Sequence, residues 1–197
     1  DGVGKTTQVD LLAARLTADA GGAREVIVTR EPGGTALGVE LRNAVMHGDH
    51  VAPRAEALLY AADRAHHVYS LVGPALAAGA VVIQDRYLDS SVAYQGAGRV
   101  LDAAQIRDLS LWATEGALPD LTVLLDLDPA SARARLDADD KPFDRLEAEQ
   151  ADFHARVRKA FLELAAAEPE RFLVLDATLP ADDLAAAVRA RVVALLS

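Results

Sequence analysis

The sequence predicts an α/β fold, a doubly wound parallel sheet with helices on both faces. Three observations support this prediction. Helical patterns alternate with short apolar runs along the 197 residues, which is the order of elements that builds a parallel sheet. The apolar runs are continuous, as in strands that are covered on both faces. The length suits a single domain, which buries roughly 70% of its unfolded surface.

The first half of the chain begins with an amphipathic helix predicted over residues 6–20, which ends at a glycine pair, a common helix stop. The run 25–30 is rich in β-branched residues and predicts a strand. Helical spacing returns over 35–48 and over the long stretch 54–79. This half therefore supplies one strand and the helices on either side of it.

Further strands are predicted in the second half at 80–84, 121–128 and 171–177, each followed by a helical or polar segment. The last predicted helix, 181–196, is apolar enough to cover the core. No internal repeat, linker or low-complexity tail divides the chain. We therefore expect one domain over residues 1–197.

The composition excludes several classes of protein. The formal net charge is −10, which argues against general nucleic-acid binding because such binding needs a basic face. The chain contains no cysteine, which excludes disulfides and thiolate metal sites. No run of about 18 apolar residues occurs, so no membrane span is expected. We expect a soluble, cytoplasmic protein that binds small ligands.

The opening stretch "DGVGKTTQ" matches the second half of a phosphate-binding loop, with Gly4, Lys5 and Thr6 in its last three places. Backbone amides of such a loop converge on phosphate oxygens at a helix N-terminus. Lys5 would neutralise the β- and γ-phosphates, and the hydroxyl of Thr6 would ligate Mg²⁺. The alternative is an ordinary glycine turn capped by a threonine.

A phosphate loop joins a buried central strand to a helix. A chain without that strand would leave a slot in the sheet and unpaired backbone groups beside it. We therefore expect a strand of about 5–10 residues before Asp1, which would bring the sheet to about five strands.

Two later motifs follow predicted strands, at the sheet edge where ligands bind. In "TREPGGT" these are Arg30 and Glu31, although the segment could equally be a solvent-facing turn with Thr35 as a helix cap. In "VVIQDRYLDSSVAYQGAGR" they are Asp85 and Arg86, able to hold Mg²⁺ and a phosphate. An Asp–Arg surface pair is the alternative. The polar groups after it suit an uncharged base; they are Ser90, Ser91, Tyr94 and Gln95.

In the predicted helix "LLYAADRAHH", Tyr60 and Arg64 share one face and could stack on a planar heterocycle, or simply pack with the arginine half-buried. We interpret His66 and His67 as surface helix residues. The charged, apolar-poor stretch 131–149 has the composition of a mobile lid, or of a solvated connection between helices.

In this order the motifs resemble those of bacterial thymidylate kinases, from Asp1 to about residue 176. The resemblance implies a P-loop fold and Mg²⁺-dependent transfer of the γ-phosphoryl group of ATP to dTMP, in dTTP synthesis. It also implies homodimers, which the helices at 54–79 and 102–115 could form. Gly2 stands where other family members place an arginine, so the resemblance implies that the catalytic cation comes from a lid at about 136–147.

The resemblance assigns residues one by one. It assigns the ATP phosphates to Gly2, Val3, Gly4, Lys5, Thr6 and Thr7. It assigns the dTMP side to Asp1, Arg30, Glu31, Arg42, Tyr60, Arg64, Arg86, Ser91, Tyr94 and Gln95. Mg²⁺ would be held by Thr6 and by Asp85, the latter directly or through water. The catalytic set is Lys5, Asp85, Arg86, Lys141 and Arg145, whereas Arg133 and Arg135 line the adenine side or are structural.

Two other functions remain open from the sequence. A kinase for another nucleoside monophosphate would need groups that pair with a purine edge in place of the set around Tyr60 and Gln95. A P-loop regulator that binds ATP without turnover would need no acceptor pocket, and the second group of arginines counts against it.

Overall fold

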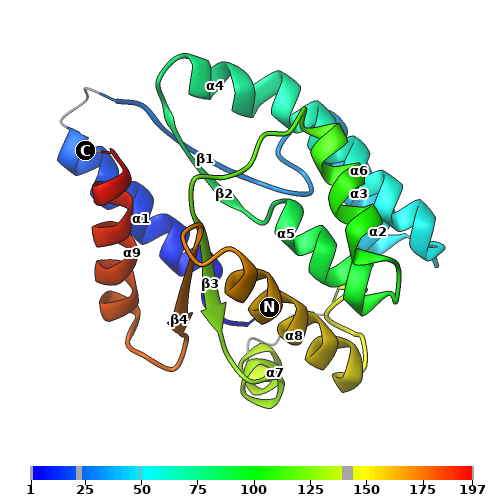
Figure 1. Ribbon diagram of the computed structural model, residues 1–197. Helices are drawn as coiled ribbons and strands as arrows, with labels where there is room; N and C mark the ends of the chain where they lie inside the picture. Colours follow the sequence, from blue (N-terminus) through cyan, green and yellow to red (C-terminus); the bar gives the residue numbers. More distant parts are fainter. Residues whose placement is uncertain (1, 21–23, 49, 139–143, 197) are drawn as a thin grey trace.

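The computed structural model describes residues 2–20, 24–48, 50–138 and 144–196. Its strands form two parallel pairs (Figure 1). β1 (Val26–Arg30) pairs with β2 (Val81–Asp85). β3 (Thr122–Asp126) pairs with β4 (Phe172–Asp176). The predicted mixed α/β architecture with parallel strands is confirmed.

The helices predicted over 6–20, 35–48, 54–79 and 181–196 lie close to their predicted positions, whereas the sequence predicted no helix at α8 (Ala151–Ala167). In chain order they are α1 (Lys5–Ala20), α2 (Ala36–His47), α3 (Pro53–His67), the π-helix η1 (Val68–Val72), α4 (Gly73–Ala77), α5 (Leu88–Ser91), the π-helix η2 (Val92–Gly98), α6 (Ala103–Ala113), α7 (Pro129–Ala138), α8 (Ala151–Ala167) and α9 (Ala181–Leu196). Thr35 caps α2, a feature that the sequence offered only under the alternative interpretation of TREPGGT, and its side chain accepts a hydrogen bond from the amide of Gly38 at 2.9 Å. The predicted long helix 54–79 is α3, η1 and α4 in succession.

Two groups of helices flank the strands (Figure 1). α1 and α9 pack together on one side. α2, α3 and α6 lie on the other side, with α8 crossing beneath. Apolar residues join α1 and α9 to the strands, and they are Leu12, Leu16, Ile83 and Val188. A second cluster joins α2, α3, η2 and α8, and it contains Val45, Met46, Tyr60, Ala93, Tyr94, Phe153 and Val157.

Between β2 and β3 lies a cavity of about 600 Å³. Within the described ranges the two strand pairs are separate sheets, so no ladder joins β2 to β3. Apolar side chains from α1, β2, β3 and α9 line the space, among them Leu12, Ile83, Leu125 and Val188.

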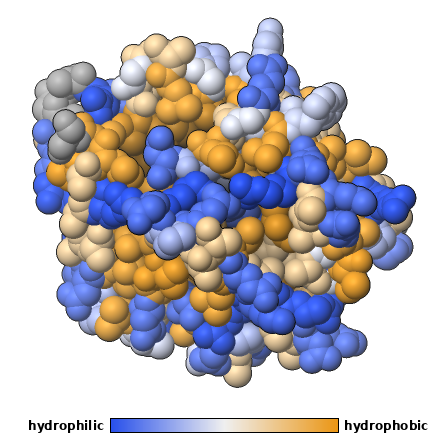
Figure 2. Space-filling model, in the orientation of Figure 1, coloured by the Kyte–Doolittle hydropathy of each residue, from blue (hydrophilic) through white to orange (hydrophobic). Residues whose placement is uncertain are grey.

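The surface is mixed in character. Figure 2 shows a band of hydrophilic residues crossing one face, with hydrophobic surface above and below it. None of the helices in the described part of the chain is long and apolar enough to cross a membrane.

Candidate functional site

The carboxyl ends of β1 and β2 bring two of the sequence motifs together. Arg30 is paired in register with Asp85, and the amide of Glu31 donates to the Asp85 carbonyl oxygen at 3.0 Å. Ligand-binding loops of parallel sheets lie at this edge. The TREPGGT and DRY motifs therefore border one site.

The segment before α1 forms a turn with left-handed glycines. Gly2 and Gly4 have φ angles of 69° and 91°, which glycine adopts without steric strain. Val3 packs with Leu125 in a small apolar cluster. A Cβ atom at residue 2 would lie 2.6 Å from the carbonyl oxygen of Ala132, so the turn lies directly against α7.

Lys5 opens α1 and lines the same cavity as Asp85 and Arg86. Burial, and then the positive charge of Arg86, lower the pKa of Lys5 to about 8, while the Asp85 carboxylate opposes this change. Thr6 and Thr7 follow in the first turn of α1 and are exposed. A helix N-terminus with exposed hydroxyls and a lysine favours a phosphate ligand.

Arg86 follows β2 in a left-handed backbone conformation, with a φ angle of 68°. Residues other than glycine rarely adopt this conformation, and those that do are often found at functional sites. The guanidinium carbon lies 4.9 Å from the centre of the Tyr94 ring, and Nη2 donates to the Tyr94 hydroxyl at 3.4 Å. Burial lowers the pKa of Arg86, but Tyr94 and Asp85 outweigh burial and raise it. The side chain therefore stays charged.

Arg30 and Arg42 add two cations beside this edge. Arg30 is exposed, and Arg42 Nη1 donates to the carbonyl oxygen of Pro32 at 3.2 Å. A Cβ atom on Gly33 would lie 3.1 Å from Arg42 Cδ and 3.9 Å from Arg30 Nε. Both side chains therefore lie over the same glycine, where they can meet an anion.

An aromatic cluster adjoins Arg86. Tyr60 is 7% exposed, and its hydroxyl lies 3.9 Å from the sulfur of Met46. Tyr94 packs edge-on against Phe153, with ring centres 6.0 Å apart. Burial raises the pKa of Tyr60 above its ordinary value, so the phenol is neutral. Aromatic walls of this kind suit a planar base.

Arg64, Ser91 and Gln95 are buried in the wall behind this cluster. Arg64 Nε donates to Glu31 at 2.8 Å, and its Nη2 donates to Ser91 Oγ at 3.1 Å. Gln95 Nε2 donates to Glu56 Oε1 at 2.9 Å. The structure brings these predicted base-side residues together, with protein groups as their hydrogen-bond partners.

Glu56 on α3 is fully buried and pairs with both Arg99 and Arg145. Arg145 Nε also donates to the carbonyl oxygen of Val45 at 2.7 Å, and Arg99 pairs with Glu149. Burial raises the pKa of Glu56, but hydrogen bonds from its amide and guanidinium partners outweigh burial and hold the pKa below its ordinary value. We call Glu56, Arg99, Arg145 and Glu149 the Glu56 cluster. It ties the end of the predicted lid to α3.

The other predicted cations lie apart from the Glu56 cluster. Arg133 forms an ion pair with Asp137, one turn further along α7. Arg135 Nη2 donates to the carbonyl oxygen of Ala177 at 3.0 Å, just after β4. Lys141 and Asp1 lie outside the described residues.

The interpretation of His66 and His67 as surface residues is wrong for His67, which is 0% exposed. His67 lies on the same face of α3 as Tyr60 and Arg64, two turns beyond Tyr60 and one turn beyond Arg64. Glu56 precedes Tyr60 by one turn on that face. The helical spacing around Tyr60 was therefore the available signal for both residues.

The DRY motif contains an acceptor suited to a cation. The Oδ1 atom of Asp85 is buried and receives no hydrogen bond from the residues that the structure describes, a state that calls for an explanation. In the described ranges, no group of three or more His, Asp or Glu side chains could hold a metal ion. A cation held mainly by phosphate oxygens needs only one or two protein ligands, and Asp85 fits that arrangement.

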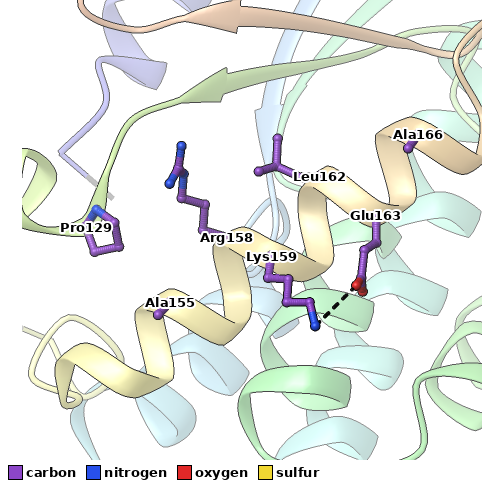
Figure 3. A pocket seen from close by; sticks show the side chains of 7 residues that line it. All are labelled: Pro129, Ala155, Arg158, Lys159, Leu162, Glu163 and Ala166. Atoms are coloured by element: carbon purple, nitrogen blue, oxygen red, sulfur yellow. Dashed lines mark ion pairs between the residues drawn. The ribbon is translucent and has the colours of Figure 1, made fainter.

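Figure 3 shows a second pocket, of about 430 Å³, along α8, lined in part by Arg158 and Lys159. Arg158 binds both oxygens of Asp126, at 2.7 and 2.9 Å. Lys159 pairs with Glu163 at 3.6 Å. The described lining contains none of the residues that the motifs predicted, so this pocket is not the candidate site.

Comparison with known proteins agrees with the motifs. A family model described as thymidylate kinase matches residues 1–188. The thymidylate kinase of Clavibacter michiganensis subsp. michiganensis is 69% identical over 198 residues, covering 100% of this chain and 92% of the relative. That of Clavibacter sepedonicus is 70% identical, covering 97% of this chain and 90% of the relative. That of Leifsonia xyli subsp. xyli is 65% identical with the same coverage.

Proposed function

The chain belongs to the thymidylate kinase family, and from this premise we propose how its residues divide the work of the reaction. It is an ATP-dependent dTMP kinase, which transfers the γ-phosphoryl group of ATP to dTMP and so makes dTDP and ADP. Phosphoryl transfer needs little covalent chemistry from the protein, so catalysis consists of positioning and of neutralising charge.

The donor side is the turn before α1. Gly2, Val3, Gly4, Lys5, Thr6 and Thr7 hold the phosphates of ATP. The left-handed glycines and the start of α1 support this proposal because both direct backbone amides at an anion. Thr6 and Asp85 would hold Mg²⁺, directly or through water. Bound there, the ion would supply positive charge that offsets the negative charge of the phosphates.

The acceptor side lies across the carboxyl ends of β1 and β2. Arg30, Arg42 and Arg86 bind the phosphate of dTMP, and Asp1 would lie near its sugar. Tyr60 packs on thymine, with Tyr94 at the sugar and base edge. Arg64, Glu31, Ser91 and Gln95 form the buried wall that holds these groups in place. The single observation that supports this assignment best is the register pairing of Arg30 with Asp85.

The cation that reaches the transferring group is proposed to come from the lid, at about 136–147. A side chain at residue 2 would lie against the Ala132 carbonyl oxygen, which disfavours an arginine there. Lys141 and Arg145 are the candidates. Arg145 would have to exchange Glu56 for a phosphate, and Glu56 would keep Arg99 as its partner.

We propose a single doubly wound domain, with a fifth strand filling the cavity between β2 and β3. A parallel strand there would pair with both neighbours and join the two sheets. The predicted strand before Asp1 would lie in this place. Adding an apolar strand to the N-terminus would then raise the melting temperature and close the cavity.

We also propose a homodimer. Leu58 on α3 and Tyr69 on η1 are 58% and 83% exposed. Trp112 on α6 is 81% exposed, and α6 packs beside α3. A second copy of the chain is the partner that would cover these apolar side chains. We place the enzyme in the cytoplasm, with ATP and dTMP as its small-molecule partners.

The function is tested by measuring ADP release with Mg-ATP and, in parallel, dTMP, dUMP, dGMP, dCMP and AMP. A strong preference for dTMP is the expected outcome. Turnover with another acceptor would keep the kinase but change the base pocket. ADP release that ignores every acceptor would contradict the assignment of the acceptor side.

A further inference from the structure

His67 contacts the residues on either side of Arg30. Its Nε2 atom lies 2.7 Å from Thr29 Oγ1, and its Nδ1 atom lies 2.9 Å from Glu31 Oε1. The imidazole is 0% exposed, and Glu31 is 3% exposed. One buried ring on α3 therefore fixes the strand end immediately before and immediately after an exposed arginine.

Because side chains alternate along an extended strand, the contact with His67 also sets the direction of Arg30. Residues at i−1 and i+1 point to the same side, and residue i points to the other. The chain is still paired with β2 at Glu31, whose amide bonds to Asp85. Holding Thr29 and Glu31 against α3 therefore turns Arg30 away from α3, on the strand edge where it is in register with Asp85.

The loop after Arg30 packs tightly against the imidazole of His67. A Cβ atom on Gly34 would lie 2.5 Å from His67 Nε2 and 2.7 Å from Thr29 Oγ1. Asp63 on α3 also contacts this loop, and its carboxylate accepts a hydrogen bond from the amide of Gly33 at 3.3 Å. The loop after Arg30 is thus fixed to α3 at successive points.

Both ring nitrogens of His67 have a hydrogen-bond partner, Nδ1 with the Glu31 carboxylate and Nε2 with the Thr29 hydroxyl. A hydroxyl can donate or accept, so Thr29 suits either role of Nε2. The other oxygen of Glu31 accepts from Arg64 Nε at 2.8 Å. Hydrogen bonds therefore connect Thr29, His67, Glu31 and Arg64 in series.

We propose that His67 is a positioning residue that directs Arg30 at the phosphate of dTMP. The proposal rests on the proposed function, because it takes Arg30 as a phosphate ligand. His67 itself touches neither substrate. Its effect falls on the phosphate end of the acceptor, since the ring fixes the two neighbours of Arg30.

Calorimetric titration of the folded protein with dTMP and with thymidine, which lacks the phosphate, tests the proposal. We expect His67→Ala to weaken dTMP binding about tenfold, comparable to the loss of one ionic contact. Thymidine binding and the KM for ATP should change less than about twofold. His66→Ala is the matched control, since His66 is partly exposed on the same helix, and it should change neither ligand.

Two conservative variants keep the test usable if His67→Ala does not fold. His67→Gln retains one donor and one acceptor and should recover much of the dTMP affinity. Thr29→Val keeps the shape of the strand residue but removes the hydroxyl, and should weaken dTMP binding selectively, by about two- to fivefold.

A double-mutant cycle with Arg30→Ala gives the decisive comparison. In that background His67→Ala should add little to the loss of dTMP affinity. Equal losses for dTMP and thymidine, or fully additive losses, would overturn the proposal. If Arg30→Ala weakens dTMP binding and His67→Ala does not, the proposal alone fails. If Arg30→Ala has no effect, the assignment of Arg30 is wrong and the proposal falls with it.

Discussion

Replacing Glu56 by glutamine removes the charge at the centre of the Glu56 cluster. The carboxylate is 0% exposed, while its partners Arg99 and Arg145 keep side-chain exposures of 16% and 18%. Removing one partner from a buried ion pair costs about 3–5 kcal/mol. The lower end applies here, because both guanidinium groups reach water and Arg99 keeps Glu149. We expect Glu56→Gln to lower the free energy of unfolding by about 3 kcal/mol, equal to roughly 6–12 °C in Tm.

The pH dependence of this loss has a definite sign. The pKa of Glu56 is lowered in the folded protein from an ordinary value of 4.5. Its ionised form therefore stabilises the fold above pH 4.5, and this contribution disappears as the pH falls through the folded pKa. The glutamine variant lacks the titration. The difference in the free energy of unfolding between the original protein and Glu56→Gln should be greatest at pH 7 and shrink below pH 4.5.

Urea denaturation of both proteins at pH 7, 5 and 4 measures this difference directly. Glu163→Gln is the matched control, because its ion pair with Lys159 is 67% exposed on the Glu163 side. An exposed pair contributes roughly 0–0.5 kcal/mol. A loss below about 1 kcal/mol for Glu56→Gln at pH 7, or a loss that grows in acid, would refute the reasoning.

Four further predictions concern residues outside the Glu56 cluster. Gly34→Ala places a Cβ atom 2.5 Å from His67 Nε2, so we expect a loss of about 1–3 kcal/mol in urea denaturation; an unchanged midpoint would contradict this packing. Asp85→Asn should lower kcat by roughly 100-fold or more, with unchanged Tm, and an unaffected kcat would remove Asp85 from the site. Because the pKa of Lys5 is lowered to about 8, its charge is lost as the pH rises through that value, and kcat/KM for ATP should fall between pH 7 and 9. Trp112→Asp should shift sedimentation towards the monomer, and an unchanged sedimentation coefficient would exclude α6 from the interface.

The sequence by itself predicted the strands, several of the helices and the location of the motifs. Apolar periodicity and glycine placement are local properties, so helix 6–20, the strand ends at Arg30 and Asp85, and the Thr35 cap were within reach of pattern alone. Parallel pairing followed from the continuous apolar runs. Because ligand loops gather at the carboxyl edge of such strands, the meeting of TREPGGT with DRY was also predictable.

The tertiary structure alone decided which partner each polar side chain took. Arg145 and Glu56 are 89 residues apart in the chain, and Arg64 lies 33 residues from Glu31. Nothing in a local pattern specifies such pairs, because they depend on which helix face is covered and by what. His67 is buried for that reason, whereas its neighbour His66 is partly exposed. Burial forces charged and polar groups to find partners, and only the packed fold determines which partners lie within reach.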